Sequence, residues 1–288
     1  MSPQPNGSFE WVQGASGPAL VCLPLAELAP HLFTTRAWRL GSRSPDEAGW
    51  GEVASAMNVD LDHLARLRQV HGTSVAVVRE ADAPGGLPEA DIILTSDMNH
   101  AIAIQTADCV PILIVDPASG AVAAAHAGWR GLAAKAPETA VQALARESGG
   151  RPSDFVVAIG PAIGACCYEV GEDVRTRFEA AGFTPPDVAR WFLADRHVDP
   201  DNPPLSGLPL RARDGHAYFD APASARDQLT ASGVAPHNVH VAGLCTASHP
   251  DWLCSYRRDG QAAGRMAAAI RSRRPDPSRR SPDDPRGR

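Results

Sequence analysis

The sequence predicts a single α/β domain in which mixed β-sheets are flanked by helices. Its 288 residues, 44% hydrophobic and 21% charged, are enough for a substantial core and are typical of a globular protein. Apolar runs rich in β-branched residues predict strands, and stretches rich in Ala, Leu and Glu predict helices. The two kinds of segment intermingle along the chain without an internal repeat, which favours one α/β domain over two.

The two ends differ in composition from the rest. Residues 1–17 are rich in Pro, Gly and Ser and are predicted to be a flexible N-terminus, so the folded domain is expected to span 18–271. Residues 272–288 are predicted to be a disordered basic tail. With Arg271, this stretch holds seven Arg and three Asp and carries +4, which leaves −10 for the remainder of a chain of net charge −6. Such an acidic body disfavours nucleic acid as a partner.

The composition also bears on location. No run of about 18 apolar residues occurs, so no membrane span is expected. The first residues, MSPQPNGSFEWVQ, lack a basic region followed by an apolar segment, so a cytoplasmic protein is expected. The six cysteines are then expected to be free thiols. The sequence contains no CxxC pair, so a structural zinc ribbon is not expected.

The expected elements follow in chain order. Strands are predicted within 19–28, 31–36, 67–80, 91–97, 154–170, 216–219 and 238–246. Helices are predicted within 52–67 with a break near Asn58, 131–149 with Pro137 in a first turn or a break, 171–182 ended by Gly182, 220–234 capped by Asp220, and at the C-terminal end of 255–273. Residues 41–50 are expected to form a loop, and 184–214 are too rich in Pro and Asp to assign.

The stretch 101–132, AIAIQTADCVPILIVDPASGAVAAAHAGWRGL, organises the rest of the chain. Its three apolar runs predict strands, with Cys109 at the break between two of them and His126 at the end of the third. His71, in QVHG, likewise follows an apolar stretch and precedes a glycine turn. The three side chains are therefore expected at strand ends, where active sites on sheets commonly form.

Two imidazoles and one thiolate suit a zinc ion, and three protein ligands leave a fourth position for water or substrate. Two other interpretations stay open on these residues alone. In the first, Cys109 is a nucleophile and His126 its base. In the second, Cys109 is a buried small apolar side chain and His126 is hydrogen-bonded in a turn, without a catalytic role for either.

Several motifs resemble one family. They are QVHG at 69–72, ADIILT at 90–95, TADCVPIL at 106–113, AAAHAGWRGLAA at 123–134, AIGPAIGACCYEVG at 158–171 and SYRRDG at 255–260. The chain, from about Phe33 to Ile270, resembles the bacterial laccase-domain or multicopper polyphenol oxidase family, since reassigned as purine nucleoside phosphorylases.

The resemblance implies both a fold and an activity. The fold would be layered, α/β/β/α-like, and similar to that of Cys/His deamidating toxins. The metal ligands would be His71, Cys109 and His126, with zinc as the cofactor and copper possible in vitro. Members of the family cleave adenosine, inosine, guanosine or methylthioadenosine with phosphate, and they also deaminate adenosine. The partners would be purine nucleosides and phosphate. The sequence leaves both a monomer and a homodimer open.

Other residues are candidates for catalysis or substrate binding. Asp108 is the acidic residue nearest Cys109 in sequence and a candidate proton shuttle, although it is equally suited to a turn. Arg130 lies at a predicted helix N-terminus, which favours an anion such as phosphate. The remaining candidates are Arg36, Arg257 and Arg258 for phosphate and Trp129 for stacking on a purine.

Three alternatives to the phosphorylase are kept. One is a metal-free Cys/His hydrolase or amidase, another a non-catalytic metal-binding partner protein, and the third a copper-dependent polyphenol oxidase. The copper-dependent oxidase is disfavoured. A multicopper site needs many histidines, often in HxH pairs, and the site region contains no HxH pair.

The chain departs from the family's pattern at three places. A Gly-Gly-Val-Ser segment expected after TTR and a later Ser-Leu-Asn loop are missing. Leu253 and Cys254 stand in place of an aromatic pair before SYRRDG. These departures put substrate choice in question more than metal binding.

Overall fold

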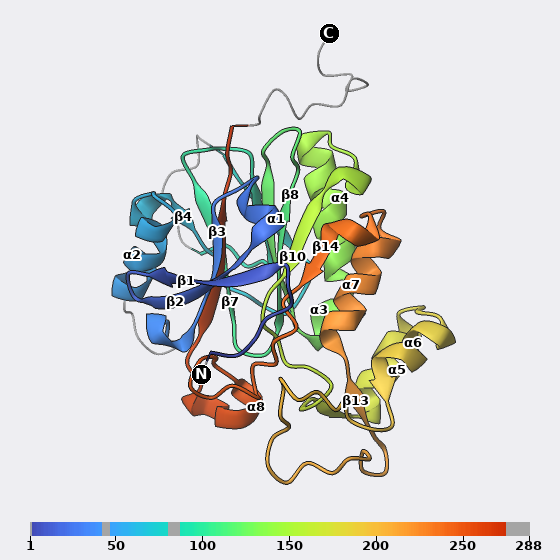
Figure 1. The fold of residues 1–288 in the computed structure, drawn as a ribbon. Helices are drawn as coiled ribbons and strands as arrows, with labels where there is room; N and C mark the ends of the chain where they lie inside the picture. The colour runs from blue at the N-terminus through green and yellow to red at the C-terminus, as the bar shows by residue number, and fades with distance from the viewer. Residues whose placement is uncertain (1, 42–46, 80–86, 275–288) are drawn as a thin grey trace.

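The computed structural model describes residues 2–41, 47–79 and 87–274, and it has four layers (Figure 1). Two six-stranded sheets pack face to face, helix α2 covers the outer face of one sheet, and α3, α4 and α7 cover the outer face of the other. The predicted α/β fold with mixed sheets between helices is therefore confirmed.

The first sheet has the order β1-β2-β3-β15-β7-β4, and the second has the order β14-β10-β8-β9-β6-β5. The strands of the first sheet are β1 (Phe9–Gly14), β2 (Gly17–Cys22), β3 (His31–Thr34), β15 (Met266–Arg271), β7 (Ala101–Thr106) and β4 (Leu64–Ala65). Those of the second are β14 (Val239–Val241), β10 (Val156–Ile159), β8 (Val110–Val115), β9 (Val122–Ala127), β6 (Ile92–Thr95) and β5 (Val75–Val78). A small third sheet joins β11 (Glu169–Gly171), β13 (His216–Phe219) and β12 (Phe192–Leu193).

The helices lie between or after these strands. The α-helices are α1 (Leu23–Ala26), α2 (Glu47–Ala56), α3 (Trp129–Ala133), α4 (Ala136–Ser148), α5 (Glu172–Ala180), α6 (Pro185–Trp191), α7 (Ala221–Ala231) and α8 (Tyr256–Asp259). Short 3-10 turns are η1 (Arg36–Trp38), η2 (Leu61–His63), η3 (Pro152–Asp154), η4 (Pro236–Asn238) and η5 (Gly260–Ala262).

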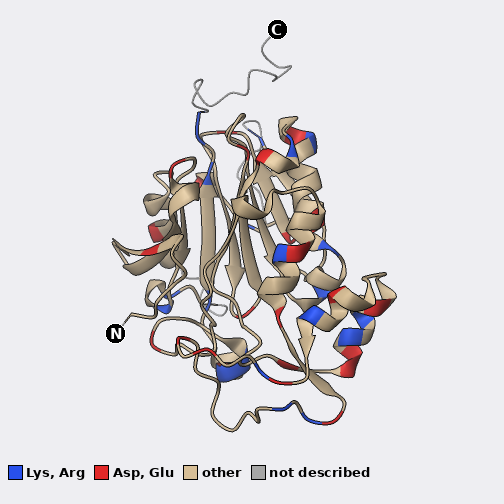
Figure 2. Cartoon of the chain, turned by 45° about the vertical axis from the view of Figure 1, so that its right-hand side comes forward, with Lys and Arg blue, Asp and Glu red and all other residues tan. Residues whose placement is uncertain are grey.

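The central strands are buried on both faces. Successive side chains of a strand point to opposite faces of the sheet, so one strand supplies two cores. In β15, Met266, Ala268 and Ile270 lie in the core between the sheets, while Ala267 and Ala269 lie in the core under α2. Lys, Arg, Asp and Glu are correspondingly found mainly on helices and loops rather than on these strands (Figure 2).

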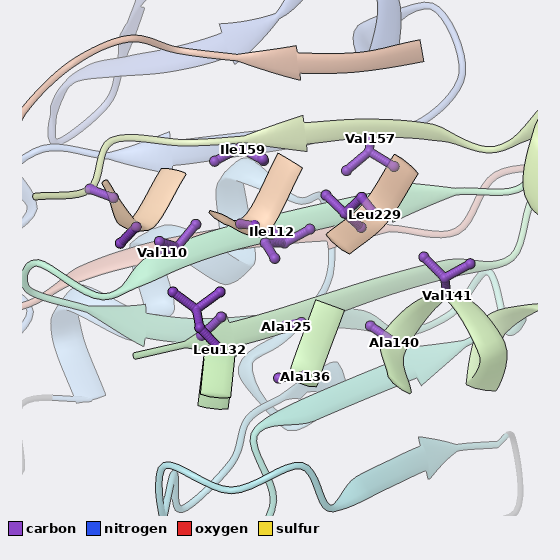
Figure 3. Close-up of a cluster of buried hydrophobic side chains, with 14 of the residues drawn as sticks. Val110, Ile112, Ala125, Leu132, Ala136, Ala140, Val141, Val157, Ile159 and Leu229 are labelled. Atoms are coloured by element: carbon purple, nitrogen blue, oxygen red, sulfur yellow. The ribbon is translucent and has the colours of Figure 1, made fainter. Parts of the chain in front are cut away.

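Helices α3, α4 and α7 close the outer face of the second sheet (Figure 3). The labelled apolar side chains there are Leu132 of α3, Ala136, Ala140 and Val141 of α4, and Leu229 of α7, which face Val110, Ile112, Ala125, Val157 and Ile159 of β8, β9 and β10. This packing fixes the ends of β8 and β9, where the predicted functional residues lie.

The C-terminal element is the main error of the sequence prediction. Residues 266–271 form β15, between β3 and β7, and not the end of a helix. The sequence MAAAIR has high helix propensity, but propensity is a weak preference that burial overrides. Because Met266 to Ile270 are all apolar, the run fits a strand buried on both faces.

The predicted flexible N-terminus is also partly wrong. Phe9–Gly14 form β1, which pairs antiparallel with β2 through the turn before Gly17. Phe9 is buried in the core between the sheets, and this burial offsets the entropy cost of ordering the segment. Within the predicted tail, Ser272 is buried and donates to the Gly120 carbonyl, whereas residues 275–288 lie outside the described part of the chain.

Several local predictions are confirmed. Asn58 has a positive φ of 54° after α2, Pro137 lies in the first turn of α4, and Gly182 has φ +83° after α5. Asp220 caps α7 by accepting from the Ala223 N–H at 2.9 Å. The predicted loop 41–50 is shorter than expected because α2 begins at Glu47, and residues 42–46 are outside the described residues.

Removing β15 should abolish the fold. A chain truncated after Arg265 loses a strand whose residues 266–270 are each at most 3% exposed, and β3 and β7 then lose their common partner. We expect no cooperative thermal transition by circular dichroism. A chain ending at Arg274 keeps β15 and should melt like the full-length protein. A cooperative melt of the shorter chain within a few degrees of the full-length protein would contradict this role of β15.

Candidate metal centre

Four chain segments meet at one end of the second sheet. Strands β5 and β6 are parallel and both begin at this end, β9 is antiparallel to β6 and finishes there, and β8 begins beside the end of β9. His71 precedes β5, Asp91 directly precedes β6, His126 lies near the end of β9 and Cys109 directly precedes β8. The topology therefore brings together side chains that are up to 55 positions apart in sequence.

His71, Cys109 and His126 converge as the sequence predicts. Their potential ligand atoms all lie within 4.8 Å of one another. The Cys109 Sγ is 4.0 Å from the His71 Nε2, and the two imidazole rings are 4.8 Å apart between centroids at an angle of 81°. One detail differs from the prediction, because the chain before His71 forms only a single β-bridge, Arg68 with Glu89, and not a full strand.

Asp91 positions two of the three residues, His126 through its ring and His71 through its backbone. It is fully buried, and its Oδ1 lies 2.8 Å from His126 Nδ1 and accepts from the His71 backbone N–H at 2.9 Å. Its Oδ2 accepts from the backbone N–H groups of Val70 and Gly72 at 3.2 and 2.6 Å. An ionised carboxylate only accepts, so His126 donates through Nδ1, and Nε2 is the nitrogen that would bind a metal ion after releasing its proton.

The backbone at the site is strained. His71 has φ 60° and Asp108 has φ 86°, a region that residues other than glycine rarely occupy. Each such residue costs of order 1–3 kcal/mol and persists only where its surroundings hold it. Asp91 holds His71 through the hydrogen bonds to its own and the next N–H. Strain at both residues is consistent with a site that needs His71 and Cys109 in fixed directions.

The charges at the site favour a thiolate. Burial raises the pKa of the Cys109 thiol, but hydrogen bonds with His126 and His71 outweigh it and lower the pKa to about 6. Burial lowers the pKa of His126, but its bonds to Asp91 and Cys109 raise it to about 9. Burial also raises the pKa of Asp91, and the bonds from His126, Gly72 and His71 outweigh it and hold the pKa below its ordinary value. Asp91 and Cys109 are thus both suited to be anionic near neutral pH.

The residues fit a metal ion. Zn–S and Zn–N bonds of about 2.3 and 2.1 Å at tetrahedral angles place the sulfur and a nitrogen about 3.6 Å apart, close to the 4.0 Å seen between Cys109 and His71. His126 is buried but His71 is exposed, so the site is open on the His71 side. Three ligands and an open side are the arrangement of catalytic rather than structural zinc sites.

Gly128, in the HAGWRG motif, leaves room for this arrangement. A Cβ at this position would lie 2.9 Å from Cys109 Sγ and 3.0 Å from His71 Cδ2. Both distances are shorter than ordinary van der Waals contacts between carbon and these atoms. Any larger residue would therefore push into two of the three potential ligands.

The Asp108 carboxylate forms hydrogen bonds with residues 246 and 257 rather than with Cys109. Its Oδ1 accepts from the Thr246 hydroxyl and its Oδ2 from the Arg257 backbone N–H, both at 2.6 Å. Burial is the largest influence on Asp108 and raises the pKa of the carboxyl group despite these bonds. Both oxygens are thus occupied in joining the segment of Cys109 to residues 246–257.

Two of the predicted arginines lie near the centre. Arg257 stacks on Tyr168, with its guanidinium carbon 4.9 Å from the ring centroid, and donates to the Glu169 carbonyl at 2.7 Å. Burial raises the pKa of Tyr168, the charges of Cys109 and Asp108 raise it further, and those of Arg257 and Arg130 lower it. Among the described residues, neither Arg130 nor Arg257 forms an ion pair with a carboxylate.

The other predicted substrate residues are differently placed. Trp129 packs partly against the core, and the Arg130 guanidinium stacks on it at 4.4 Å. Arg258 pairs with Asp259 and donates to three backbone carbonyls, those of Thr246, Ala247 and Leu253. Arg36 donates to the Pro250 carbonyl. Arg258 is thus fully engaged in holding its own segment, which makes it a poor phosphate ligand.

Of the departures from the family pattern, one can be placed. Leu253 and Cys254 are buried in the core between the two sheets. Their substitution for an aromatic pair therefore changes the core and not the open surface of the centre. The loop after TTR lies partly at 42–46, outside the described residues.

Three residues of the site were not identified from the sequence. They are Asp91, Gly128 and Tyr168, and all lie within motifs that had been recognised: ADIILT, HAGWRG and ACCYEVG. The motifs were a signal for them, but the partners that give Asp91 its role are separated from it by 19 to 35 positions.

The fold and the site together define a class of protein. It is a layered α/β/β/α protein in which two imidazoles and a thiol surround one open position. Residues 47–273 match the family described as multi-copper polyphenol oxidoreductase laccase, and the chain belongs to that family. In the part of the chain that the structure describes, no helix has the length and apolar character needed to cross a membrane.

Individual relatives agree with this assignment. The chain is 35% identical over 270 residues to a purine nucleoside phosphorylase of Deinococcus radiodurans, covering 88% of this chain and 94% of the relative. It is 32% identical over 225 residues to adenosine deaminase RL5 of an unknown prokaryotic organism, covering 76% and 78%. The crystal structure of YlmD from Geobacillus stearothermophilus is similar with a TM-score of 0.75 and 29% identity, covering 91% of this chain and 98% of YlmD. The family resemblance predicted from the motifs is confirmed.

Proposed function

We propose that this protein is a zinc-dependent purine nucleoside phosphorylase of the cytoplasm, with adenosine deaminase as a side activity. The observation that carries the proposal is the convergence of His71, Cys109 and His126 around one open point, in a chain similar to proteins named purine nucleoside phosphorylase and adenosine deaminase. The substrates would be adenosine, inosine, guanosine or methylthioadenosine, together with phosphate.

Bound at this site, zinc would supply a Lewis acid with one open position. Asp91 would keep His126 in the tautomer that presents Nε2, and Cys109 would bind as the thiolate. Arg130 and Arg257 are cations without carboxylate partners among the described residues, so they would bind phosphate beside the centre. Tyr168, whose one face carries Arg257, would border the place of the nucleoside.

A metal-free Cys/His hydrolase would use Cys109 and His126 as nucleophile and base. That chemistry needs one imidazole, whereas this site directs two at the sulfur, and Asp91 binds the His126 ring and the His71 backbone N–H. Iodoacetamide labelling of Cys109 separates the two functions. Protection by zinc supports the metal enzyme, and rapid labelling unaffected by zinc supports the hydrolase.

A four-copper oxidase is not supported. In the described ranges, the groups of side chains able to hold a metal are the His71 centre and a cluster of three cysteines. Neither offers the numerous imidazoles that such a copper cluster needs.

Purified protein incubated with inosine and phosphate should release hypoxanthine and ribose 1-phosphate. Cys109→Ala should lower kcat/KM by at least about 100-fold, because loss of a metal ligand exceeds the effect of losing a ligand's partner. Chromatography of the bases checks this result. Equal product from wild type and Cys109→Ala would contradict the proposal, and adenosine converted to inosine without phosphate would measure the deaminase activity.

The KM for phosphate tests the proposed phosphate ligands separately. Arg130→Ala should raise the KM for phosphate about 10-fold or more, because a hydrogen bond to a charged group contributes about 1.5–3 kcal/mol. Arg36→Ala, an exposed arginine hydrogen-bonded to Pro250, is the matched control and should leave this KM unchanged. Equal effects in both variants would remove Arg130 from the phosphate site.

A further inference from the structure

A second group of possible metal ligands lies outside the centre already described. Cys166, Cys167 and Cys245 are all free thiols and are 3%, 0% and 3% exposed. Their sulfur atoms lie within 4.8 Å of one another, and those of Cys166 and Cys167 are 3.5 Å apart. The other two buried thiols, Cys22 and Cys254, belong to the core between the sheets, which is the ordinary place of a small apolar side chain.

The topology holds the three thiols together. Cys166 and Cys167 follow β10, and Cys245 follows β14, which is the parallel neighbour of β10. The pairing continues beyond both strands, because Ala162 forms a parallel bridge with Cys245 and accepts from the Thr246 N–H at 3.1 Å. The Cys245 N–H also donates to the buried Asn202 at 2.6 Å. The thiols are therefore positioned by backbone hydrogen bonds and not by side-chain packing alone.

The spacing suits a metal bound by three sulfurs. A Zn–S bond of about 2.3 Å at tetrahedral angles places two sulfurs about 3.8 Å apart. The observed distances, 3.5 Å for Cys166–Cys167 and at most 4.8 Å for the others, need only small shifts to reach this value.

The surroundings also suit a metal. The Ser248 hydroxyl is 3.7 Å from the sulfurs of both Cys166 and Cys167 and is a potential fourth donor. The Gly164 N–H donates to the Cys245 sulfur at 3.4 Å, a bond that stabilises a thiolate. Ile163, Ala247 and other apolar residues enclose the cluster, and a cavity of about 340 Å³ reaches Cys166 and Cys245 and offers an entry path.

We propose that Cys166, Cys167 and Cys245 form a second metal site, which binds a thiophilic ion independently of the His71 centre. Three thiolates are soft ligands and select zinc or copper(I) over harder ions such as magnesium or calcium. With Ser248 as the fourth donor the site is closed, which is typical of a structural metal.

Zinc content tests the proposal. Reduced wild-type protein dialysed against zinc and then buffer should retain two equivalents. Cys245→Ser and Cys109→Ala should each retain one, and the double variant none. Cys254→Ser, a buried cysteine outside both groups, should retain two, and thermal melts verify that each variant is folded. One equivalent in wild type that is lost in Cys109→Ala and kept in Cys245→Ser would overturn the second site.

Wild-type protein gives an independent answer if the variants do not fold. X-ray absorption at the zinc edge should show on average two sulfur ligands per zinc, because the His71 centre supplies one and the cysteine cluster supplies three. An average of one sulfur would overturn the proposal. Anaerobic loading with copper(I) then distinguishes the ions. If the wild type binds one copper that Cys245→Ser does not bind, the cysteine cluster is a copper(I) site. If the wild type keeps two zinc ions that copper(I) does not displace, the cluster is a zinc site.

Discussion

Replacing Asp91 by asparagine should lower the zinc affinity of the His71 centre by about 10- to 100-fold, the usual effect of removing a ligand's hydrogen-bonding partner. The asparagine keeps the volume of Asp91, but its NH2 group replaces one of the two accepting oxygens. Either the N–H groups of Val70 and Gly72 or the His71 N–H and the His126 ring therefore lose their acceptor. The asparagine also lacks the charge that orients His126. Both imidazoles should therefore lose their fixed positions, and phosphorolysis should fall with metal content.

Asp97 provides the matched control for this variant. It follows β6 whereas Asp91 precedes it, and its Oδ2 pairs with the Nδ1 of the buried His100 at 2.6 Å. Asp97→Asn should thus disturb a similar Asp–His pair and leave zinc affinity unchanged. Competition with a chromophoric chelator measures both variants. Wild-type affinity in Asp91→Asn, or an equal loss in Asp97→Asn, would show that Asp91 does not position the ligands.

The same residue shows how far the sequence could predict the site. His71, Cys109 and His126 were found because thiol and imidazole side chains are chemically distinctive and fall beside glycines at strand ends. Asp91 directly precedes the strand Ile92–Thr95, a position where turn and cap residues are common, and nothing local distinguishes it. Its role arises only when β6 pairs with β9 and brings His126 to its side, a contact across 35 positions.

For the fold as well, local sequence predicts some strands, whereas others depend on contacts that are distant in sequence. The strands of 101–127 were predictable because their apolar residues are β-branched or bounded by turns, and the structure places all three. The run MAAAIR was predicted as a helix because alanine favours helices, and only its position between β3 and β7 makes it a strand. Alanine is suited to that position because its side chain fills little space between layers that are covered on both faces.

Gly128 is the residue where steric fit should control function most sharply. Gly128→Ala should remove zinc binding at the His71 centre almost completely, because the added Cβ would lie 2.9 Å from the Cys109 sulfur and 3.0 Å from the His71 ring. Both neighbours are held by a strained backbone at His71 and Asp108, so they cannot yield without losing their ligand geometry. Activity should fall at least as far as in Asp91→Asn, since the ligands themselves are displaced.

Gly131→Ala is the control within the same HAGWRG motif. A Cβ there would meet its nearest atoms, the Ala136 side chain and the Gly72 carbonyl, at 3.5 Å, an ordinary contact, and alanine favours helix α3. The measurement is the rise in melting temperature on adding zinc, because an ion bound to the folded state stabilises it more the more tightly it binds. To isolate the His71 centre, both glycine variants are made in a Cys245→Ser background. A zinc-dependent rise in Gly131→Ala and none in Gly128→Ala is expected. An undiminished rise in Gly128→Ala would show that the metal does not lie between Cys109, His71 and His126, and would remove the basis of the proposed phosphorylase.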